Sequence, residues 1–457
     1  MWGHIYSASL LQHTTKKNLA KPDMDKSGKI GIGLLGLGIV GSQVARTLVQ
    51  KSERIAQQVG RPVVLRAALV RDKDRSRDAS IPPHILTNRF EDILGDPNVD
   101  IIVELIGGVD PAVHYMRSVI SSGKHVVTAN KDAMATAGPE LIRLAEEQGL
   151  NLLYEASVGG GIPIIGALQK DLLANDFESL HAIINGTTNY ILTKMSQEGM
   201  GFQVALRRAQ ELGYAEADPS KDVEGVDAAY KLAILATLAF HTRVVAGDVY
   251  HEGISRLSSQ DFRYAQELGY AIKLLAIARK EDGSLSLRVH PAMVPQEHLL
   301  SKVDGVLNAI EIEGDLVGRV VFHGQGAGPL PTSSAVIGDI LEVARSIASG
   351  RGPNRGVGPN SMLRISPIDD LVTQYYARLK VADQAGVLAQ IAKVLGDSDI
   401  SIASVIQKNA DAANQTAEIV VMTHPAREAH VRRAVDHMQA LGVVKEIGNV
   451  IRVEQWA

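Results

Sequence analysis

The chain has 457 residues, which is enough for two or three domains. Hydrophobic residues make up 45% of the chain and charged residues 21%, so we expect packed domains and exclude disorder over most of the length. The net charge of -4 argues against a nucleic-acid partner, and no apolar run approaches the roughly 18 residues of a membrane helix. With 0 Cys, disulfides, thiolate metal sites and a cysteine nucleophile are excluded, and the composition fits the reducing cytoplasm.

The first part of the chain alternates strands with helices. Residues 1–28 are polar, and we predict a disordered extension there. Hydrophobic periodicity then predicts helices after Gly41, at 111–122 and at 141–149, with strands at 29–35, 63–70, 99–106, 126–128 and 152–155. This alternation predicts a doubly wound α/β fold, a Rossmann-type dinucleotide-binding domain over residues 29–156.

Two further domains are expected. Residues 157–324 mix helices (164–173, 189–197, 202–212, 226–240) with strands (180–185, 285–291, 319–323), which predicts an α+β domain. A helix is predicted at 332–348, and the Gly/Pro-rich stretch that follows makes 349–372 a linker. Residues 373–457 have the order strand–helix–strand–strand–helix–strand, typical of a ferredoxin-like domain, with elements at 375–381, 387–395, 401–407, 417–423, 426–441 and 450–453.

A glycine-rich loop, Gly36-Leu-Gly38-Ile-Val-Gly41, follows the first strand and opens a helix. In such a loop the first glycine permits a tight turn, the second admits a pyrophosphate, and the third lets helix and strand pack closely. The second strand ends at Arg71, which favours the 2′-phosphate of NADP, whereas Asp72 and Asp74 keep NAD open.

A second constellation lies at Asp227 and Lys231. Their i,i+4 spacing places both on one face of a helix whose flanking residues are small or apolar. A surface pair of this kind is common and often has no function. On a buried helix near further carboxylates, the pattern indicates a site where a lysine exchanges a proton with an oxygen whose carbon exchanges hydride with nicotinamide.

These residues resemble the homoserine dehydrogenase family. The resemblance runs from about residue 29 to residue 348 and is carried, in order, by Ala129–Lys131, Tyr154–Pro163, Asn185–Asn189, Gly213–Pro219, Asp222–Lys231 and Gly324–Thr332. It implies reduction of L-aspartate 4-semialdehyde to L-homoserine with NAD(P)H, in threonine, methionine and isoleucine biosynthesis. It also implies that residues 157–324 dimerise, giving a homodimer or homotetramer, and that residues 325–348 complete the dinucleotide-binding domain.

The resemblance assigns roles residue by residue. Lys231 matches the proton donor to the aldehyde oxygen, and Lys131 matches a lysine beside both nicotinamide and substrate. Glu216 and Asp227 match residues that hold the substrate, Asp222 a supporting carboxylate, and Gly213 a backbone contact. Together, loop and resemblance predict cofactor contacts at Gly36, Gly38, Ile39, Val40, Gly41, Arg71, Thr128, Lys131, Gly326 and Gly328. A monovalent cation, read as sodium, is implied at Glu155, Val158, Gly160 and Ile162, where a purely structural glycine turn is the alternative.

The C-terminal part resembles an ACT domain, a module that senses small molecules. The resemblance rests on Asp383–Leu388, with Ala385 where the family often has Pro, and on Ile400–Ile406. By analogy the effector is L-threonine; a domain that only mediates assembly is the alternative.

Other functions stay open at this point. An NAD(P)-binding amino-acid sensor without turnover is one, although it would have no use for the Asp227/Lys231 pair. An ACT-bearing dehydrogenase of the phosphoglycerate type is another, but its cofactor fold sits in mid-chain. A phosphorylating semialdehyde dehydrogenase is excluded because it forms a thiohemiacetal and this chain has 0 Cys.

Overall fold

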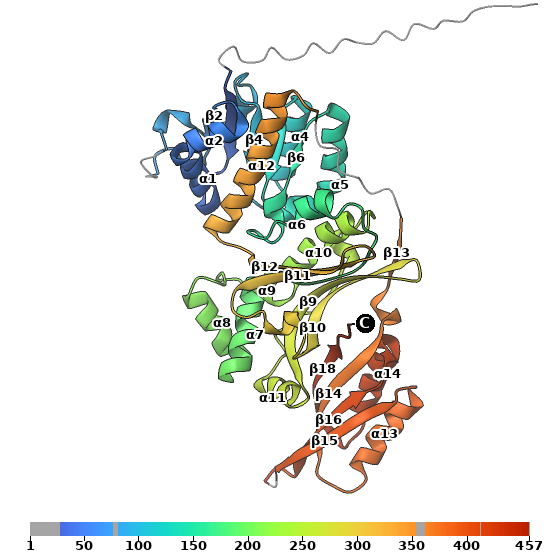
Figure 1. Ribbon diagram of the computed structural model, residues 1–457. Helices are drawn as coiled ribbons and strands as arrows, with labels where there is room; N and C mark the ends of the chain where they lie inside the picture. The colour runs from blue at the N-terminus through green and yellow to red at the C-terminus, as the bar shows by residue number, and fades with distance from the viewer. Residues whose placement is uncertain (1–27, 76–80, 353–361, 412, 457) are drawn as a thin grey trace, which may run out of the picture.

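The computed structural model describes residues 28–75, 81–352, 362–411 and 413–456. All but the last residue of the extension predicted at 1–28 lies outside this part. Three bodies follow one another along the molecule: an N-terminal α/β domain, a central domain on a mixed sheet, and a C-terminal α/β domain (Figure 1). No helix in the described part is long and apolar enough to cross a membrane.

The N-terminal domain contains a six-stranded sheet in the order β3-β2-β1-β4-β5-β6, with every pair parallel. Its strands are β1 (Ile30–Leu35), β2 (Val63–Leu69), β3 (Leu86–Thr87), β4 (Ile101–Glu104), β5 (His125–Thr128) and β6 (Leu152–Leu153). Its helices are α1 (Ile39–Gln50), α2 (Ser52–Val59), the 3₁₀ turn η1 (Pro83–Ile85), α3 (Phe90–Leu94), α4 (Ala112–Ser121) and α5 (Lys131–Gln148). The strand order reverses between β1 and β4, where such sheets bind ligands. The Rossmann-type fold predicted from the sequence is confirmed.

Helix α12 (Pro329–Ser349) returns from the central domain to the N-terminal one. It packs against α1 and α2, and its Val336, Ile340 and Val343 are fully buried in the same apolar cluster as β1. Helix α5 starts ten residues before the predicted position, at Lys131, because the Asn130 side chain caps it by accepting the Ala133 N–H at 3.0 Å.

The central domain is built on long antiparallel strands in the order β12-β11-β7-β9-β10. These are β7 (Phe177–Ile183), β9 (Tyr270–Glu281), β10 (Ser284–Pro295), β11 (Leu307–Gly314) and β12 (Gly318–Gln325), with the short β8 (Tyr250–His251) beside β10. Its helical segments are η2 (Glu155–Ser157), α6 (Ile164–Gly166), the π-helical η3 (Ala167–Asp171), α7 (Gly186–Glu198), α8 (Phe202–Glu211), α9 (Ser220–Val223), α10 (Val226–Ala239), η4 (Ala246–Asp248), α11 (Ser259–Glu267) and η5 (Leu299–Lys302). Helix α10 is mostly buried, as its small and apolar residues predict.

The C-terminal domain has the predicted ferredoxin-like order. Its elements are β14 (Val372–Ala382), α13 (Val387–Asp397), β15 (Ile402–Asp411), β16 (Thr416–Thr423), β17 (Ala426–Arg427), α14 (Glu428–Gln439) and β18 (Val444–Val453). Strand β18 pairs with β10 of the central domain, opposite Ala292 and Met293, so both domains share one 12-stranded sheet. Within the expected linker, β13 (Arg364–Ser366) also pairs with β10, and η6 (Ile368–Asp370) follows it.

Candidate functional site

The glycine-rich loop joins β1 to α1 at the point where the strand order reverses. Gly36 has φ +106°, and a Cβ there would lie 2.9 Å from the carbonyl oxygen of Leu105. A Cβ at Gly41 would lie 2.2 Å from the carbonyl oxygen of Gly36, so a side chain at either position would displace the loop. Around Gly38 no described atom comes within 4 Å of an added Cβ, and α1 has no side-chain cap. The first N–H groups of α1 are therefore available to an anion such as a phosphate.

A cavity of about 590 Å³ opens over this loop. Gly36 lines it together with Arg71 and Asp72 from the end of β2 and with residues that follow β4. The exposed Ile39 and the half-buried Val40 form the adjoining first turn of α1. The cavity volume lies in the range of cofactor sites. Arg71 thus lines the same cavity as the loop. The neighbouring Asp72 adds a carboxylate, so the end of β2 carries both the basic residue type that suits NADP and the acidic type that suits NAD.

Glu104 is a buried carboxylate to which the sequence analysis assigned no role. It ends β4 and is fully buried. Its Oε1 accepts hydrogen bonds from the N–H groups of Ile106 at 2.7 Å and Gly107 at 3.2 Å, and its Oε2 accepts one from the Thr128 hydroxyl at 2.7 Å. Glu104 therefore fixes backbone that forms the wall of the cavity. Thr128, predicted to contact the cofactor, is itself fully buried with its hydroxyl engaged by this carboxylate.

Lys131, Asp227 and Lys231 meet in one ion-pair cluster, although Lys131 starts α5 and the other two lie on α10. Lys231 Nζ lies 2.7 Å from Asp227 Oδ2 and donates a second hydrogen bond to the Ile184 carbonyl oxygen at 2.8 Å. Lys131 Nζ pairs with the other carboxylate oxygen, Asp227 Oδ1. One buried carboxylate thus bridges two ammonium groups from two domains.

Asn185 ties this cluster to Asp222. It caps α7, because its Oδ1 accepts the Thr188 N–H at 2.8 Å. Its Nδ2 donates to Asp222 Oδ1 at 2.8 Å and to Asp227 Oδ2 at 2.9 Å. The sequence analysis included Asn185 only within a family string, and its position just after a strand and before a helix was the available signal for a cap.

The charges of the cluster stabilise one another. Burial opposes the ionisation of Asp227, which is 3% exposed, but Lys231 and Lys131 outweigh it and hold the pKa of the carboxyl well below its ordinary value. Burial likewise opposes the charge on Lys131, yet Asp227, with smaller contributions from Asp132 and Asp222, raises its pKa. The site holds one ionised carboxylate between the Nζ atoms of Lys131 and Lys231, which suits a position where negative charge develops on a substrate oxygen.

The segment between α8 and α9 carries the other predicted substrate residues. Gly213 has φ +74°, and both Gly213 and Glu216 are exposed. Thr187 of α7 donates a 2.7 Å hydrogen bond to the carbonyl oxygen of Tyr214, which holds this segment near the cluster. The Glu216 carboxylate makes no hydrogen bond or ion pair with another described residue, so the structure brings Asp222 into the cluster and leaves Glu216 outside it.

Gly326 and Gly328 lie where the chain returns toward α12. A Cβ at Gly326 would lie 1.9 Å from Asn308 Nδ2, and a Cβ at Gly160 would lie 2.6 Å from the Gly326 carbonyl oxygen. Gly328 has φ +120° and precedes α12. These close approaches require glycine, and they lock the 158–162 loop against the return segment.

Glu155 lies beside that loop. Its carboxylate accepts the N–H groups of Ile165 at 2.9 Å and Gly166 at 2.6 Å, and its own N–H donates to Asp339 Oδ2 at 2.9 Å. Burial raises the pKa of Glu155, and burial together with Glu155 raises the pKa of Asp339 well above its ordinary value. No group of three His, Cys, Asp or Glu in the described part could hold a metal, so a cation here would depend largely on backbone oxygens.

The strand order, the open glycine loop and the Lys131–Asp227–Lys231 cluster define an NAD(P)-dependent oxidoreductase, here with a C-terminal ACT domain. Family profiles agree with this class. "Homoserine dehydrogenase, NAD binding domain" matches residues 36–155, "Homoserine dehydrogenase" matches residues 163–341, and "ACT domain" matches residues 375–443.

The chain belongs to the homoserine dehydrogenase family. It is 44% identical to the homoserine dehydrogenase of Synechocystis over 93% of this chain and 99% of that protein, and 42% identical to that of Neisseria gonorrhoeae over 93% and 98%. The crystal structure of a homoserine dehydrogenase from Thiobacillus denitrificans has a TM-score of 0.88 and 42% identity, covering 93% of this chain and 98% of that one. A hyperthermophilic archaeal homoserine dehydrogenase in complex with NADPH has a TM-score of 0.59 and 27% identity, covering 69% and 97%. The resemblance seen in the sequence is confirmed.

Proposed function

We propose that the chain catalyses the reversible reduction of L-aspartate 4-semialdehyde to L-homoserine. The observation that carries this proposal is the Lys231 ammonium, held between Asp227 and the Ile184 carbonyl oxygen. Reduction of an aldehyde leaves negative charge on its oxygen, and a fixed ammonium group both stabilises that charge and delivers a proton. The nicotinamide cofactor, when bound, supplies the hydride.

The other residues of the cluster supply positive charge near the reacting oxygen and contacts to the substrate. Lys131 keeps Asp227 ionised and adds positive charge near the reacting oxygen, which is supported by their ion pair. Asp227 and Asp222, joined by Asn185, hold the substrate through its amino group. Glu216 and the backbone of Gly213, which lie outside the cluster, contact the same amino group. Opposite charges suit this division, since the ammonium groups face the developing oxyanion and the carboxylates face the substrate amine.

The cofactor is NADP in preference to NAD. Support comes from Arg71, which lines the cavity over the glycine loop and whose guanidinium matches a 2′-phosphate. The NADPH complex of the archaeal relative points the same way. The predicted contacts at Thr128, Gly326 and Gly328 act through the shape of the surrounding backbone.

A sodium ion would be held by Glu155 and the backbone oxygens of Val158, Gly160 and Ile162. The fit rests on charge, because Glu155 and Asp339 place two acids together in a largely buried position where a cation would lower their mutual repulsion. Oxygen donors suit such an ion, whose role here is to hold the 158–162 loop in place.

Regulation and assembly complete the proposal. L-Threonine acts as the effector through the ACT domain, the active form is a homodimer or homotetramer, and the enzyme works in the cytoplasm. The ACT match and the shared 12-stranded sheet support regulation through the C-terminal domain.

The direct test is NADP⁺-dependent oxidation of L-homoserine by the purified protein, followed by the absorbance of the NADPH that forms. Activity with homoserine and none with other hydroxy amino acids supports the proposal. Tight cofactor binding without turnover on homoserine contradicts it.

A further inference from the structure

Three buried polar side chains form a hydrogen-bonded network at the carboxyl ends of β4 and β5, and we call Glu104, Thr128 and Asn130 the Glu104 network. Glu104 ends β4 and lies opposite Thr128, which ends β5. The Thr128 hydroxyl donates to Glu104 Oε2 at 2.7 Å and accepts the Asn130 N–H at 3.0 Å. Glu104 and Thr128 are fully buried, and Asn130 is 5% exposed. Because the network is shielded from solvent, water does not compete for these bonds.

One end of the Glu104 network holds the loop between β4 and α4. Glu104 Oε1 accepts the N–H groups of Ile106 and Gly107. Asn130 Nδ2 donates to the carbonyl oxygen of Gly108 at 2.7 Å, on the other side of the same turn. Ile106 lines the cavity over the glycine-rich loop. The network therefore fixes, from two sides, a turn that bounds the cofactor cavity.

The other end of the Glu104 network holds the start of α5, whose first residue is Lys131. Asn130 Oδ1 accepts the Ala133 N–H at 3.0 Å and so caps this helix. Lys131 in turn pairs with Asp227 of the catalytic cluster. One amide side chain thus bonds to the cofactor loop through its nitrogen and to the helix of Lys131 through its oxygen. The position of the cavity wall relative to Lys131 is fixed by this double contact.

A carboxylate is an unusual choice for the buried strand β4. Glu104 forms no ion pair with any residue in the described part of the chain, and burial of a carboxylate without a counter-ion opposes folding. An apolar residue would suit the strand, but it would leave three donors without their acceptor. The two oxygens of Glu104 therefore serve the arrangement of the loop and of Thr128.

We propose that Glu104 is a positioning residue for hydride transfer. Through Thr128 and Asn130, it holds the loop that bounds the cofactor cavity in a fixed arrangement with the helix that carries Lys131. The inference rests on the proposed function, because it requires that a cofactor and an aldehyde meet beside Lys131. A displacement of about 1 Å between reacting groups can lower a rate by about a hundredfold, so loosening the Glu104 network should slow hydride transfer.

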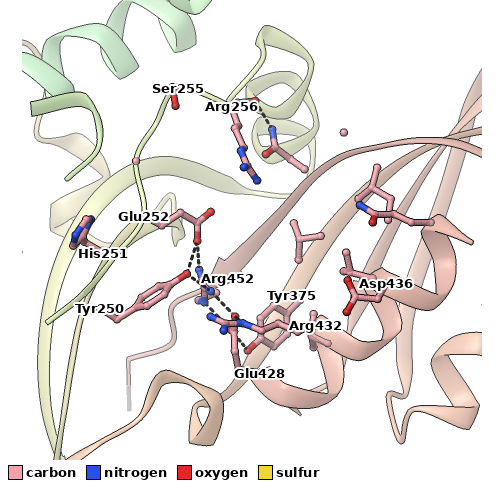
Figure 2. Close-up of a pocket in the computed structure, with 18 of the residues that line it drawn as sticks. Tyr250, His251, Glu252, Ser255, Arg256, Tyr375, Glu428, Arg432, Asp436 and Arg452 are labelled. Atoms are coloured by element: carbon pink, nitrogen blue, oxygen red, sulfur yellow. Dashed lines mark hydrogen bonds and ion pairs between the residues drawn. The ribbon is translucent and has the colours of Figure 1, made fainter. Parts of the chain in front are cut away.

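The test removes the hydroxyl at the centre of the network. Thr128→Val keeps the side-chain volume and removes the hydroxyl, and Thr128→Ser retains a hydroxyl. The matched control is Tyr375→Phe, because Tyr375 also donates to a buried carboxylate, Glu428 Oε2, at 2.8 Å, in a cavity between the central and C-terminal domains (Figure 2). Stopped-flow absorbance follows NADPH formation in the first turnover with L-homoserine. Deuterium at C4 of homoserine, the carbon that gives up the hydride, identifies the hydride-transfer step in the trace.

We expect the rate constant of hydride transfer to fall by about tenfold in Thr128→Val and to recover in Thr128→Ser. KM for homoserine should stay nearly constant, since Asp222 and Asp227 keep their contacts with Asn185. Tyr375→Phe should transfer hydride as fast as the unmodified protein. A first-turnover rate constant does not depend on the amount of folded protein, so a purely structural role for Thr128 would leave it unchanged. An unchanged rate constant in Thr128→Val, or an equal fall in Tyr375→Phe, overturns the proposal.

Hydrogen exchange measures the positioning without turnover. In Thr128→Val the amides of residues 106–108 and 130–133 should both exchange faster, whereas Tyr375→Phe should change neither segment. If Thr128→Val does not fold, Glu104→Gln, which keeps the side-chain volume, carries the same expectations, and normal hydride transfer and exchange in that variant overturn the proposal. If the unmodified protein does not oxidise homoserine, the proposed function fails, while exchange in the two segments still decides whether the Glu104 network links them.

Discussion

Replacing Lys231 with Met removes the ammonium group and keeps the apolar stem of the side chain. In the structure this group donates to Ile184 and Asp227, and its side chain is 12% exposed. Loss of a positioned proton donor costs a factor of roughly 10²–10⁴ in rate, so kcat should fall by at least about a hundredfold. Asp227 keeps Lys131 and Asn185 as partners, so the free energy of unfolding should fall by only about 1–3 kcal/mol.

Three measurements separate chemistry from folding: steady-state kinetics with homoserine, cofactor titration by fluorescence, and urea denaturation. Lys393→Met is the matched control, since Lys393 forms a 2.8 Å i,i+4 pair with Asp397 on α13 in which both side chains are mostly exposed. That pair should contribute less than about 1 kcal/mol, and its loss should leave kcat unchanged. A folded Lys231→Met variant with normal kcat would refute the proton-donor role. Weakened cofactor binding as the main defect would contradict the reasoning as well.

The remaining predictions concern cofactor choice and the C-terminal tail. Arg71→Ser should raise KM for NADPH by about tenfold and leave KM for NADH nearly constant; equal changes in both would remove Arg71 from the 2′-phosphate site. Glu454→Gln should lower the free energy of unfolding by about 3 kcal/mol in urea, because it breaks a buried contact with Arg288 at 3.1 Å. The pKa of Glu454 is lowered to about 2, since Arg288 and His181 outweigh its burial. Its contribution should therefore be full above the unfolded-state pKa of about 4.3 and be lost as pH falls toward about 2, a loss absent from Glu454→Gln.

Local patterns were the part of the site that the sequence could predict. The spacing of Gly36, Gly38 and Gly41 predicts a tight turn between a strand and a helix, and the structure has β1 before this turn and α1 after it. The i,i+4 spacing of Asp227 and Lys231 places their charged groups on one helix face, and they lie 2.7 Å apart. In both cases the residues concerned are separated by only a few positions in the sequence, so local structure alone sets their arrangement.

Contacts between distant segments could not be predicted in this way. Asn185 reaches Asp222 and Asp227 only because β7 ends next to α10, and Lys131 reaches Asp227 from another domain. Glu104 looked like part of an apolar strand, and its role depends on a turn that forms after it. Hydrophobic periodicity reports which face of an element is buried, whereas these pairings depend on which elements meet.

The junction between β10 and β18 shows what such a long-range pairing can do. Just after β18, the buried Glu454 contacts His181 on β7 at 3.2 Å, and Trp456 stacks on His298 with ring centroids 3.7 Å apart. Residues 454–456 thus pack against the central domain. Strand β7 leads within three residues of His181 to Ile184, whose carbonyl oxygen holds Lys231. Because packed interiors resist independent displacement, the contacts from Glu454 through His181 and the end of β7 connect the C-terminal segment to the residue whose carbonyl oxygen holds Lys231.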